Sequence, residues 1–146
     1  MFEQLIHHLQ DKLKNNTVAD FADVYTYEVE EFKGDPIAVV IPSNNESDYN
    51  TTSENSRIYA FKVMIFVNRV MRTKDSAETV MREIVTSVID DFDKDYTLSG
   101  LACPAGYTFI NVFASPSSWG YVGAESEYRV AEINLQCRVS VDVTLI

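Results

Sequence analysis

Apolar and polar residues alternate regularly in the last part of the chain. Between residues 129 and 146 nearly every second side chain is apolar: Ala131, Ile133, Leu135, Cys137, Val139, Val141, Val143 and Leu145. A period of two over such a length is typical of a β-strand with one buried and one solvated face. The pattern therefore predicts a long strand at the end of the sequence.

Residues 57–70 form a second predicted strand, and it is apolar on both faces. One face holds Tyr59, Phe61, Val63, Ile65 and Val67, and the other holds Ile58, Ala60, Met64 and Phe66. A strand with one wet face would alternate, so each side of this strand must be covered. Helices would cover one side. A loop, another sheet or a neighbouring subunit would cover the other.

Two segments carry apolar residues at helical spacing, residues 2–14 and residues 72–92. Asp75 and Glu78 are spaced as a capping-box pair at the start of the second helix. This helix should end between Phe92 and Lys94. If it continued through Asp95, that carboxylate would lie within the apolar arc without a partner, which is costly.

The remaining segments are connections and shorter strands. Residues 24–42 are interpreted as a hairpin around a turn at 32–36. Residues 43–56 hold one aromatic and no aliphatic side chain, which predicts a mobile polar loop, disordered or ordered by a partner. A short apolar stretch at 107–114 leads into a polar connection at 115–126.

These elements predict one domain over residues 1–146. The fold class is α+β, with a mainly antiparallel β-sheet of long strands packed against two α-helices. No internal repeat divides the chain.

Charge excludes one class of partner. With 22 acidic and 12 basic side chains the formal net charge is −10 at pH 7, which repels phosphate and opposes nucleic-acid binding. Passage of DNA along the surface without binding is compatible with this charge. No stretch approaches the ~18 apolar residues of a membrane span, and no signal peptide opens the chain, so we expect a soluble cytosolic protein.

Candidate chemistry is sparse. There is no GxxxxGK phosphate loop and no GxSxG elbow. His7 and His8 are adjacent on a helix and point apart, and Cys103 and Cys137 lack the spacing of metal ligands and are expected to be free thiols. We therefore expect that this protein is not an enzyme and that it binds no metal ion and no cofactor.

The segment DDFDKDYTLSG, residues 90–100, places oxygen-bearing side chains at the spacing of a calcium loop that begins at Asp91. Tyr96 stands where that loop needs glycine, and Ala102 stands where it needs a bidentate glutamate. A helix end is the better interpretation. Its aspartates would be solvated, bonded to turn amides, or, for Asp90 and Asp93, paired with a basic side chain of another subunit.

This same segment carries a family resemblance. An acidic helix end followed by Thr-Leu-x-Gly-Leu and a proline resembles the tail terminator (tail completion) proteins of long-tailed bacteriophages. The residues that carry it are Asp95, Thr97, Leu98, Gly100, Leu101 and Pro104. The strand opened by Arg57 and an aromatic residue, and the alternating last strand, are similar to the same family. Ser99 departs from the family's second glycine, and residues 107–123 match nothing in it.

The resemblance implies a structural virion protein that assembles in the host cytoplasm as a homohexameric ring. Such a ring would cap the head-proximal end of the tail tube, end tube polymerisation and join the tail to a head-completion or connector protein. DNA would pass through the ring without specific binding, and no membrane would be involved.

The resemblance also suggests roles for surface residues. Glu28, Glu30, Glu31 and Asp35 would line or approach the lumen, with a plain solvated face as the alternative. Candidate contacts with other subunits or partners are Asp48, Tyr49, Arg57, Tyr59, Asp90, Asp93, Trp119 and Tyr121. Trp119, Tyr121 and Tyr128 are aromatic residues of the kind that anchor interfaces, and core packing under a loop is the alternative for these three.

Other interpretations stay open at this point. They are another head-tail joining (neck) ring protein, a generic ligand-binding α+β module, and an enzyme whose site forms between subunits.

Overall fold

The computed structural model describes residues 1–49 and 53–146, with residues 45–49 described by their backbone alone. Its helices are α1 (Phe2–Lys14), α2 (Lys74–Lys94) and the short 3₁₀ turn η1 (Ala124–Ser126). Its strands are β1 (Asp23–Tyr25), β2 (Ile37–Tyr49), β3 (Glu54–Asn68), β4 (Tyr107–Val122) and β5 (Tyr128–Asp142).

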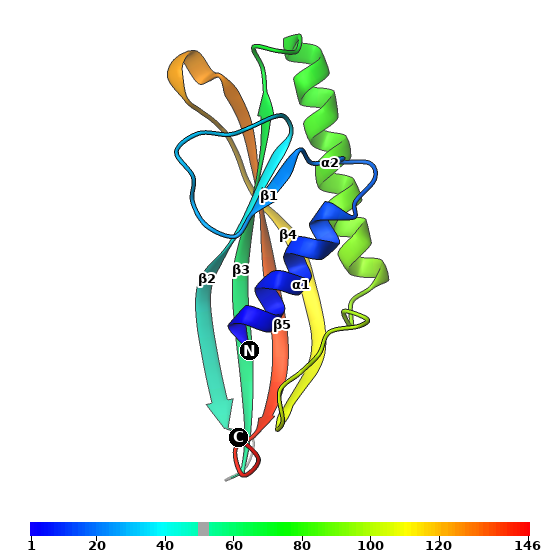
Figure 1. The fold of residues 1–146 in the computed structure, drawn as a ribbon, viewed down its shortest axis with the longest axis vertical. Helices are drawn as coiled ribbons and strands as arrows, with labels where there is room; N and C mark the ends of the chain where they lie inside the picture. Colours follow the sequence, from blue (N-terminus) through cyan, green and yellow to red (C-terminus); the bar gives the residue numbers. More distant parts are fainter. Residues whose placement is uncertain (50–52) are drawn as a thin grey trace.

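The strands form one sheet in the order β1-β2-β3-β5-β4, and both long helices lie on the same side of it (Figure 1). All pairs except β1 with β2 are antiparallel. The predicted α+β class, with long antiparallel strands packed against two helices, is confirmed. The bounds of α1 agree with the predicted residues 2–14.

The main core lies between the helices and one face of the sheet. The alternating residues of the last strand supply this face, and β3 pairs with them residue by residue, with Phe61 opposite Leu135 and Ile65 opposite Ala131. All four of these side chains are fully or almost fully buried. The period of two therefore predicted correctly which side of β5 is buried.

The second face of β3 is covered within the chain at one end. Phe32, from the loop at residues 26–36, lies over Phe66 with ring centroids 4.6 Å apart and meets the ring of Tyr128 edge-on at 5.4 Å. Ile37 and Val39 complete this smaller apolar cluster. Of the covers that the sequence left open, the structure shows a loop here.

The hairpin predicted for residues 24–42 is wrong. β1 pairs with β2 in parallel, from Asp23 opposite Ile37 to Tyr25 opposite Val39. A parallel pair needs a connection that returns the chain to the same end of the sheet, so a tight turn cannot join the two strands. Residues 26–36 make this connection as a loop across the second face.

The polar loop predicted for residues 43–56 is also wrong. β2 continues to Tyr49 and β3 begins at Glu54, with pairing that extends to Tyr49 opposite Asn55. β3 also pairs with β5 over this stretch. Backbone hydrogen bonds on both sides of β3 thus organise a sequence that has little apolar area to bury. Residues 50–52 of the predicted loop lie outside the described residues.

The short stretch and polar connection predicted for residues 107–126 form the single long strand β4 up to Val122. Pairing with β5 shifts register between Phe109 and Asn111 and between Pro116 and Trp119. β4 is an edge strand, where a proline and bulges are tolerated because one side makes no ladder bonds. The polar sequence therefore concealed a strand.

The start of α2 differs from the predicted capping box. Thr73 is the N-cap, and its hydroxyl oxygen accepts a hydrogen bond from the Ser76 amide at 3.2 Å. Glu78 does not cap the helix, because its carboxylate pairs with Arg129. At the other end the helix stops at Lys94, as the burial argument for Asp95 predicted.

Candidate functional site

The acidic turn after α2 is a folding element. Asp95 is the C-cap of the helix, and its Oδ1 accepts hydrogen bonds from the Ser99 amide at 2.9 Å and the Ser99 hydroxyl at 2.7 Å. Its Oδ2 accepts a bond from Lys12 Nζ of α1 at 3.1 Å. These bonds, those from Ser99 foremost, lower the pKa of Asp95 to about 2.

The rest of the family-like motif shapes this turn. Leu98 is buried in the core with φ of 49°, and Gly100 follows with φ of 85°. The Val112 amide of β4 donates to the Tyr96 carbonyl at 2.8 Å and ties the turn to the sheet. Thr97 is exposed, and Leu101 and Pro104 are partly buried. The motif fixes the path from α2 to β4, and no chemistry is visible in it.

The aspartates of α2 do not converge on a common point. Asp91 accepts a 2.6 Å hydrogen bond from the side-chain amide of Asn16, which also bonds Ser87 and holds the end of α1 against α2. Asp90 and Asp93 are exposed. Among the side chains that the structure describes, those of residues 1–44 and 53–146, no three His, Cys, Asp or Glu residues are grouped to hold a metal ion.

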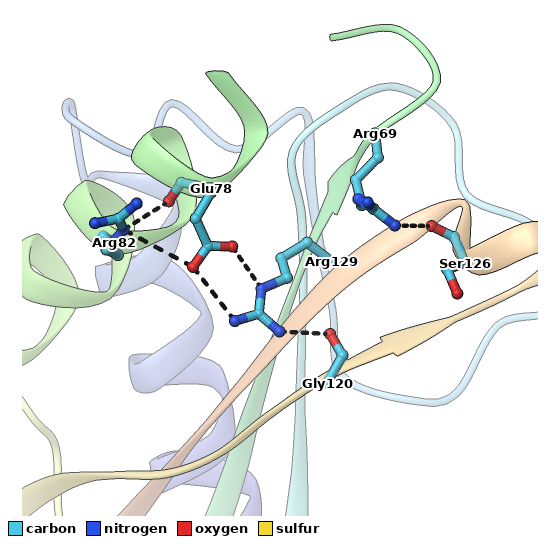
Figure 2. Close-up of polar contacts among 6 residues, drawn as sticks. All are labelled: Arg69, Glu78, Arg82, Gly120, Ser126 and Arg129. Atoms are coloured by element: carbon cyan, nitrogen blue, oxygen red, sulfur yellow. Dashed lines mark hydrogen bonds and ion pairs between the residues drawn. The ribbon is translucent and has the colours of Figure 1, made fainter. Parts of the chain in front are cut away.

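A second charged cluster lies near the start of α2, at the other end of the helix from the acidic turn. Its centre is Arg129, close to the start of β5 (Figure 2). Its guanidinium meets the Glu78 carboxylate of α2 through two contacts, at 2.8 and 3.3 Å, and donates to the Gly120 carbonyl at 3.1 Å. The Arg129 side chain is only 13% exposed. A two-pronged arginine–carboxylate pair is geometrically specific, so it locks α2 to the β4–β5 end of the sheet.

Aromatic rings of β4 lie against this centre. The Arg129 guanidinium is 4.7 Å from the Tyr121 ring centroid and 5.5 Å from that of Trp119. Arg69, which follows β3, lies 4.7 Å from the Tyr121 ring centroid. It also donates to the Ser126 carbonyl at 2.9 Å (Figure 2). Trp119 and Tyr121 nevertheless stay 42% and 53% exposed. They are surface aromatics in contact with cations, so the alternative that they pack in the core under a loop is wrong, and their candidate place in an interface stays a prediction.

The proposed lumen residues separate into two groups. Glu28, Glu30 and Glu31 are exposed on the loop at residues 26–36. Asp35 is turned away from them: it accepts bonds from the Asn68 amide and from Arg72 Nε, both at 2.8 Å, and its side chain is 7% exposed. A role for Asp35 on an open lumen surface is therefore wrong, because its carboxylate joins the loop to the residues after β3.

A groove of about 610 Å³ lies beside these three glutamates. The apolar residues of its lining, which we call the floor, include Phe32, Val39, Met64, Phe66 and Tyr128. Glu127 is the fourth carboxylate of the lining, and we call the four glutamates the rim. Burial, followed by the negative charges of Glu127 and Asp35, raises the pKa of Tyr128.

The candidate contacts near the other end of the sheet have different fates. Tyr59 is 4% exposed and packs edge-on against Phe2 at 4.7 Å, so its proposed place in an interface is wrong. Arg57 donates to the hydroxyls of Tyr59 and Tyr107 at 3.2 and 3.3 Å. These bonds, chiefly that to Tyr59, raise its pKa. Asp48 and Tyr49 have backbone positions in β2, and their side chains lie outside the described residues.

Neither the groove nor the anchoring role of Arg129 was predicted from the sequence. The apolar second face of residues 57–70 did indicate part of the groove floor. The wrong hairpin prediction, however, gave no reason to expect that the loop at residues 26–36 forms the rest of the groove. Arg129 gave no signal, because a polar residue in an alternating strand looks solvated. The Asn16 network was missed for a similar reason, since its partners lie on a helix far away in sequence.

Neither cysteine forms a disulfide: Cys103 is exposed and Cys137 is buried, as free thiols. Burial raises the pKa of Cys137 to about 12, which makes it a poor nucleophile. No helix in the described part of the chain is long and apolar enough to cross a membrane.

Comparison with known proteins gives a match in fold alone. The sequence matches no protein-family model, and no curated protein matches it. Among solved structures, a chain of the "Virion of native gene transfer agent (GTA) particle" has a similar fold, with a TM-score of 0.59 and 11% sequence identity. The match covers 93% of this chain and 94% of that chain. The two chains therefore share one fold over nearly their whole lengths.

Proposed function

We propose that this chain is a structural virion protein, and more specifically a tail terminator that forms a ring on the head-proximal end of a phage tail tube. One observation carries the proposal: a fold shared over nearly the full length of both chains with a chain of a virion particle. An isolated common motif would match only in part, whereas here little of either chain is left over.

The motif of the acidic turn supports the finer assignment. Asp95, Leu98 and Gly100 all have defined structural tasks in the turn that leads from α2 to β4. These are residues that the resemblance to tail terminators rests on. These residues determine the local geometry of one turn. A short motif of this kind can therefore be kept in proteins that share the fold while most of the remaining sequence differs.

The surface suits a protein whose role is assembly. The edge strand β4 exposes several large apolar side chains: Ile110, Phe113, Trp119, Tyr121 and Val122. Apolar side chains gathered on one strand mark protein–protein contacts more often than isolated ones do. The net charge of −10 in turn favours a channel in which DNA slides without sticking.

A neck ring protein that joins head and tail elsewhere is the second candidate, because the same fold likeness supports it. The two candidates differ in what they bind. A tail terminator binds the open end of a tail tube and stops its growth, whereas a neighbouring joining protein binds the connector and leaves tube length unchanged. Measuring tube length in the presence of the purified chain tests the proposed function.

A further inference from the structure

The groove beside the acidic loop has the chemistry of a binding site for a basic, apolar segment. Its floor contains the rings of Phe32, Phe66 and Tyr128. Its rim carries Glu28, Glu30, Glu31 and Glu127, and within the described residues none of these four carboxylates forms an ion pair. Four unpaired carboxylates around an apolar floor favour an occupant that brings both positive charge and apolar side chains.

The same chain presents such a segment. Residues 69–74, RVMRTK, contain three basic residues and no acidic one. Val70 and Met71 are 76% and 75% exposed, more than any other large apolar side chain in the part of the chain that the structure describes. Lys74 is exposed and makes no ion pair within the described residues.

This segment is held in one conformation. The side-chain oxygen of Asn68 accepts hydrogen bonds from the amides of Val70 and Met71, at 2.8 and 3.0 Å. Arg72 is fixed by its 2.8 Å ion pair with Asp35. These bonds restrict the conformations that the segment can adopt. The bonds present Val70 and Met71 to the outside, and an ordered loop loses less entropy when it binds.

Both surfaces lie toward the same end of the sheet. The loop at residues 26–36 lies beside the upper half of the sheet, and residues 69–73 join the top of β3 to α2 (Figure 1). Arg72 and Asp35 tie the segment to the base of the acidic loop, so the segment cannot fold back into its own groove without breaking that pair. A second copy can supply the occupant.

We propose that each copy in the ring seats Val70 and Met71 in the groove of the next copy, with Lys74 facing the glutamates of the rim. The segment and the groove are different surfaces of one chain, so the contact is head-to-tail, which is the kind of contact that forms a ring when its rotation closes. This inference rests on the proposed ring. It assigns Glu28, Glu30 and Glu31 to the contact between subunits in place of a free lumen surface.

Two variants test the contact. Met71→Asp removes the segment's apolar anchor, and the double substitution Glu30→Lys with Glu31→Lys reverses charge at the rim. All three side chains are exposed, so both variants should fold, which circular dichroism and thermal melting verify. Leu145→Asp is the matched control, because this exposed apolar side chain is next to the C-terminus, which lies at the opposite end of the molecule (Figure 1).

Native mass spectrometry of full-length protein gives the result. Wild type and Leu145→Asp should form the same ring, and each contact variant alone should associate at least about tenfold more weakly. A mixture of the two contact variants should give a 1:1 heterodimer, since one intact segment still meets one intact groove. A wild type that stays monomeric, contact variants that assemble like wild type, or a mixture that yields no heterodimer would each overturn the inference.

Failure of this contact is separable from failure of the proposed function. If both contact variants still form rings and still limit tube length, the ring function stands and the contact is wrong. If the wild type assembles through the segment and groove but leaves tube growth unchanged, the contact stands and the tail terminator function is wrong.

Discussion

Single residues in this chain serve mainly to fix turns and ends of elements. For Asp95, the sequence alone predicted one structural property and could not predict another. The cost of burying an unpaired carboxylate predicted that α2 ends before it, and the structure ends the helix at Lys94. The bonds to Ser99 and Lys12 could not be predicted, because they depend on the shape of the turn and on a helix far away in sequence.

Replacing Asp95 by alanine should lower the free energy of unfolding by about 1–2 kcal/mol near neutral pH. The folded pKa of about 2 lies below the ordinary value of 3.8, so the carboxylate stabilises the fold above pH 3.8 and loses this effect as pH falls toward 2. Most of the difference between wild type and variant should therefore be lost by about pH 2, where half of the folded chains carry a protonated Asp95. Denaturant unfolding at several pH values measures it.

Asp93→Ala is the control for this prediction. Asp93 is exposed at the same helix end, close to the negative end of the helix dipole, so its removal should leave stability unchanged or slightly higher. A loss as large for Asp93→Ala as for Asp95→Ala, or a loss that does not depend on pH, would show that the turn bonds of Asp95 are not the cause.

Secondary-structure elements were predicted well where periodicity is strong and poorly where neighbours decide. α1 and β5 carry their own apolar patterns and were identified from sequence. Residues 43–48 of β2 and 115–118 of β4 carry little apolar area, and they continue their strands because the adjacent strands β3 and β5 offer backbone partners, although the pairing shifts register in both places. β1 is too short to signal its parallel pairing. Local patterns carry no information about such distant partners.

Arg129 joins α2 to the β4–β5 end of the sheet, and lysine should not replace it. Arg129→Lys keeps the charge but loses the two-pronged contact with Glu78 and the stacking on Tyr121, so we expect a loss of about 2 kcal/mol in unfolding free energy. The matched control is Arg82→Lys, since Arg82 meets the same carboxylate at 3.8 Å with a 65% exposed side chain. Denaturant unfolding should show almost no effect of that change. Equal losses for the two variants would contradict the anchoring role.

For the whole molecule, we expect substitution of the exposed apolar residues of β4 to weaken assembly and to leave the fold of the subunit intact. Trp119→Ala removes a half-exposed ring that covers Arg129, so the subunit should stay folded, with a loss of at most about 1 kcal/mol. Ring formation, measured by native mass, should weaken. Tyr96→Ala, which removes a comparably exposed ring after α2, should leave assembly intact. A Trp119→Ala subunit that unfolds would instead assign this residue to the core.

The fold class and the buried face of the sheet followed from sequence, whereas the surfaces relevant to assembly did not. The groove needs Phe32, Phe66 and Tyr128 together, and these come from a loop and two strands. Only the fold brings them together. The site residues expected from the resemblance therefore had different outcomes. Tyr59 is in the core and Asp35 ties two loops together, whereas Trp119 stays at the surface, as its candidate place in an interface requires.

The central claim, that the chain ends tail-tube growth, is tested most directly by adding the purified protein to polymerising tail tube protein. Tube lengths are then measured by electron microscopy. Tubes should stop growing once one end carries a ring of this chain, and their mean length should fall as more chain is added. Tubes that reach their full length with no density of this chain at either end would contradict this claim.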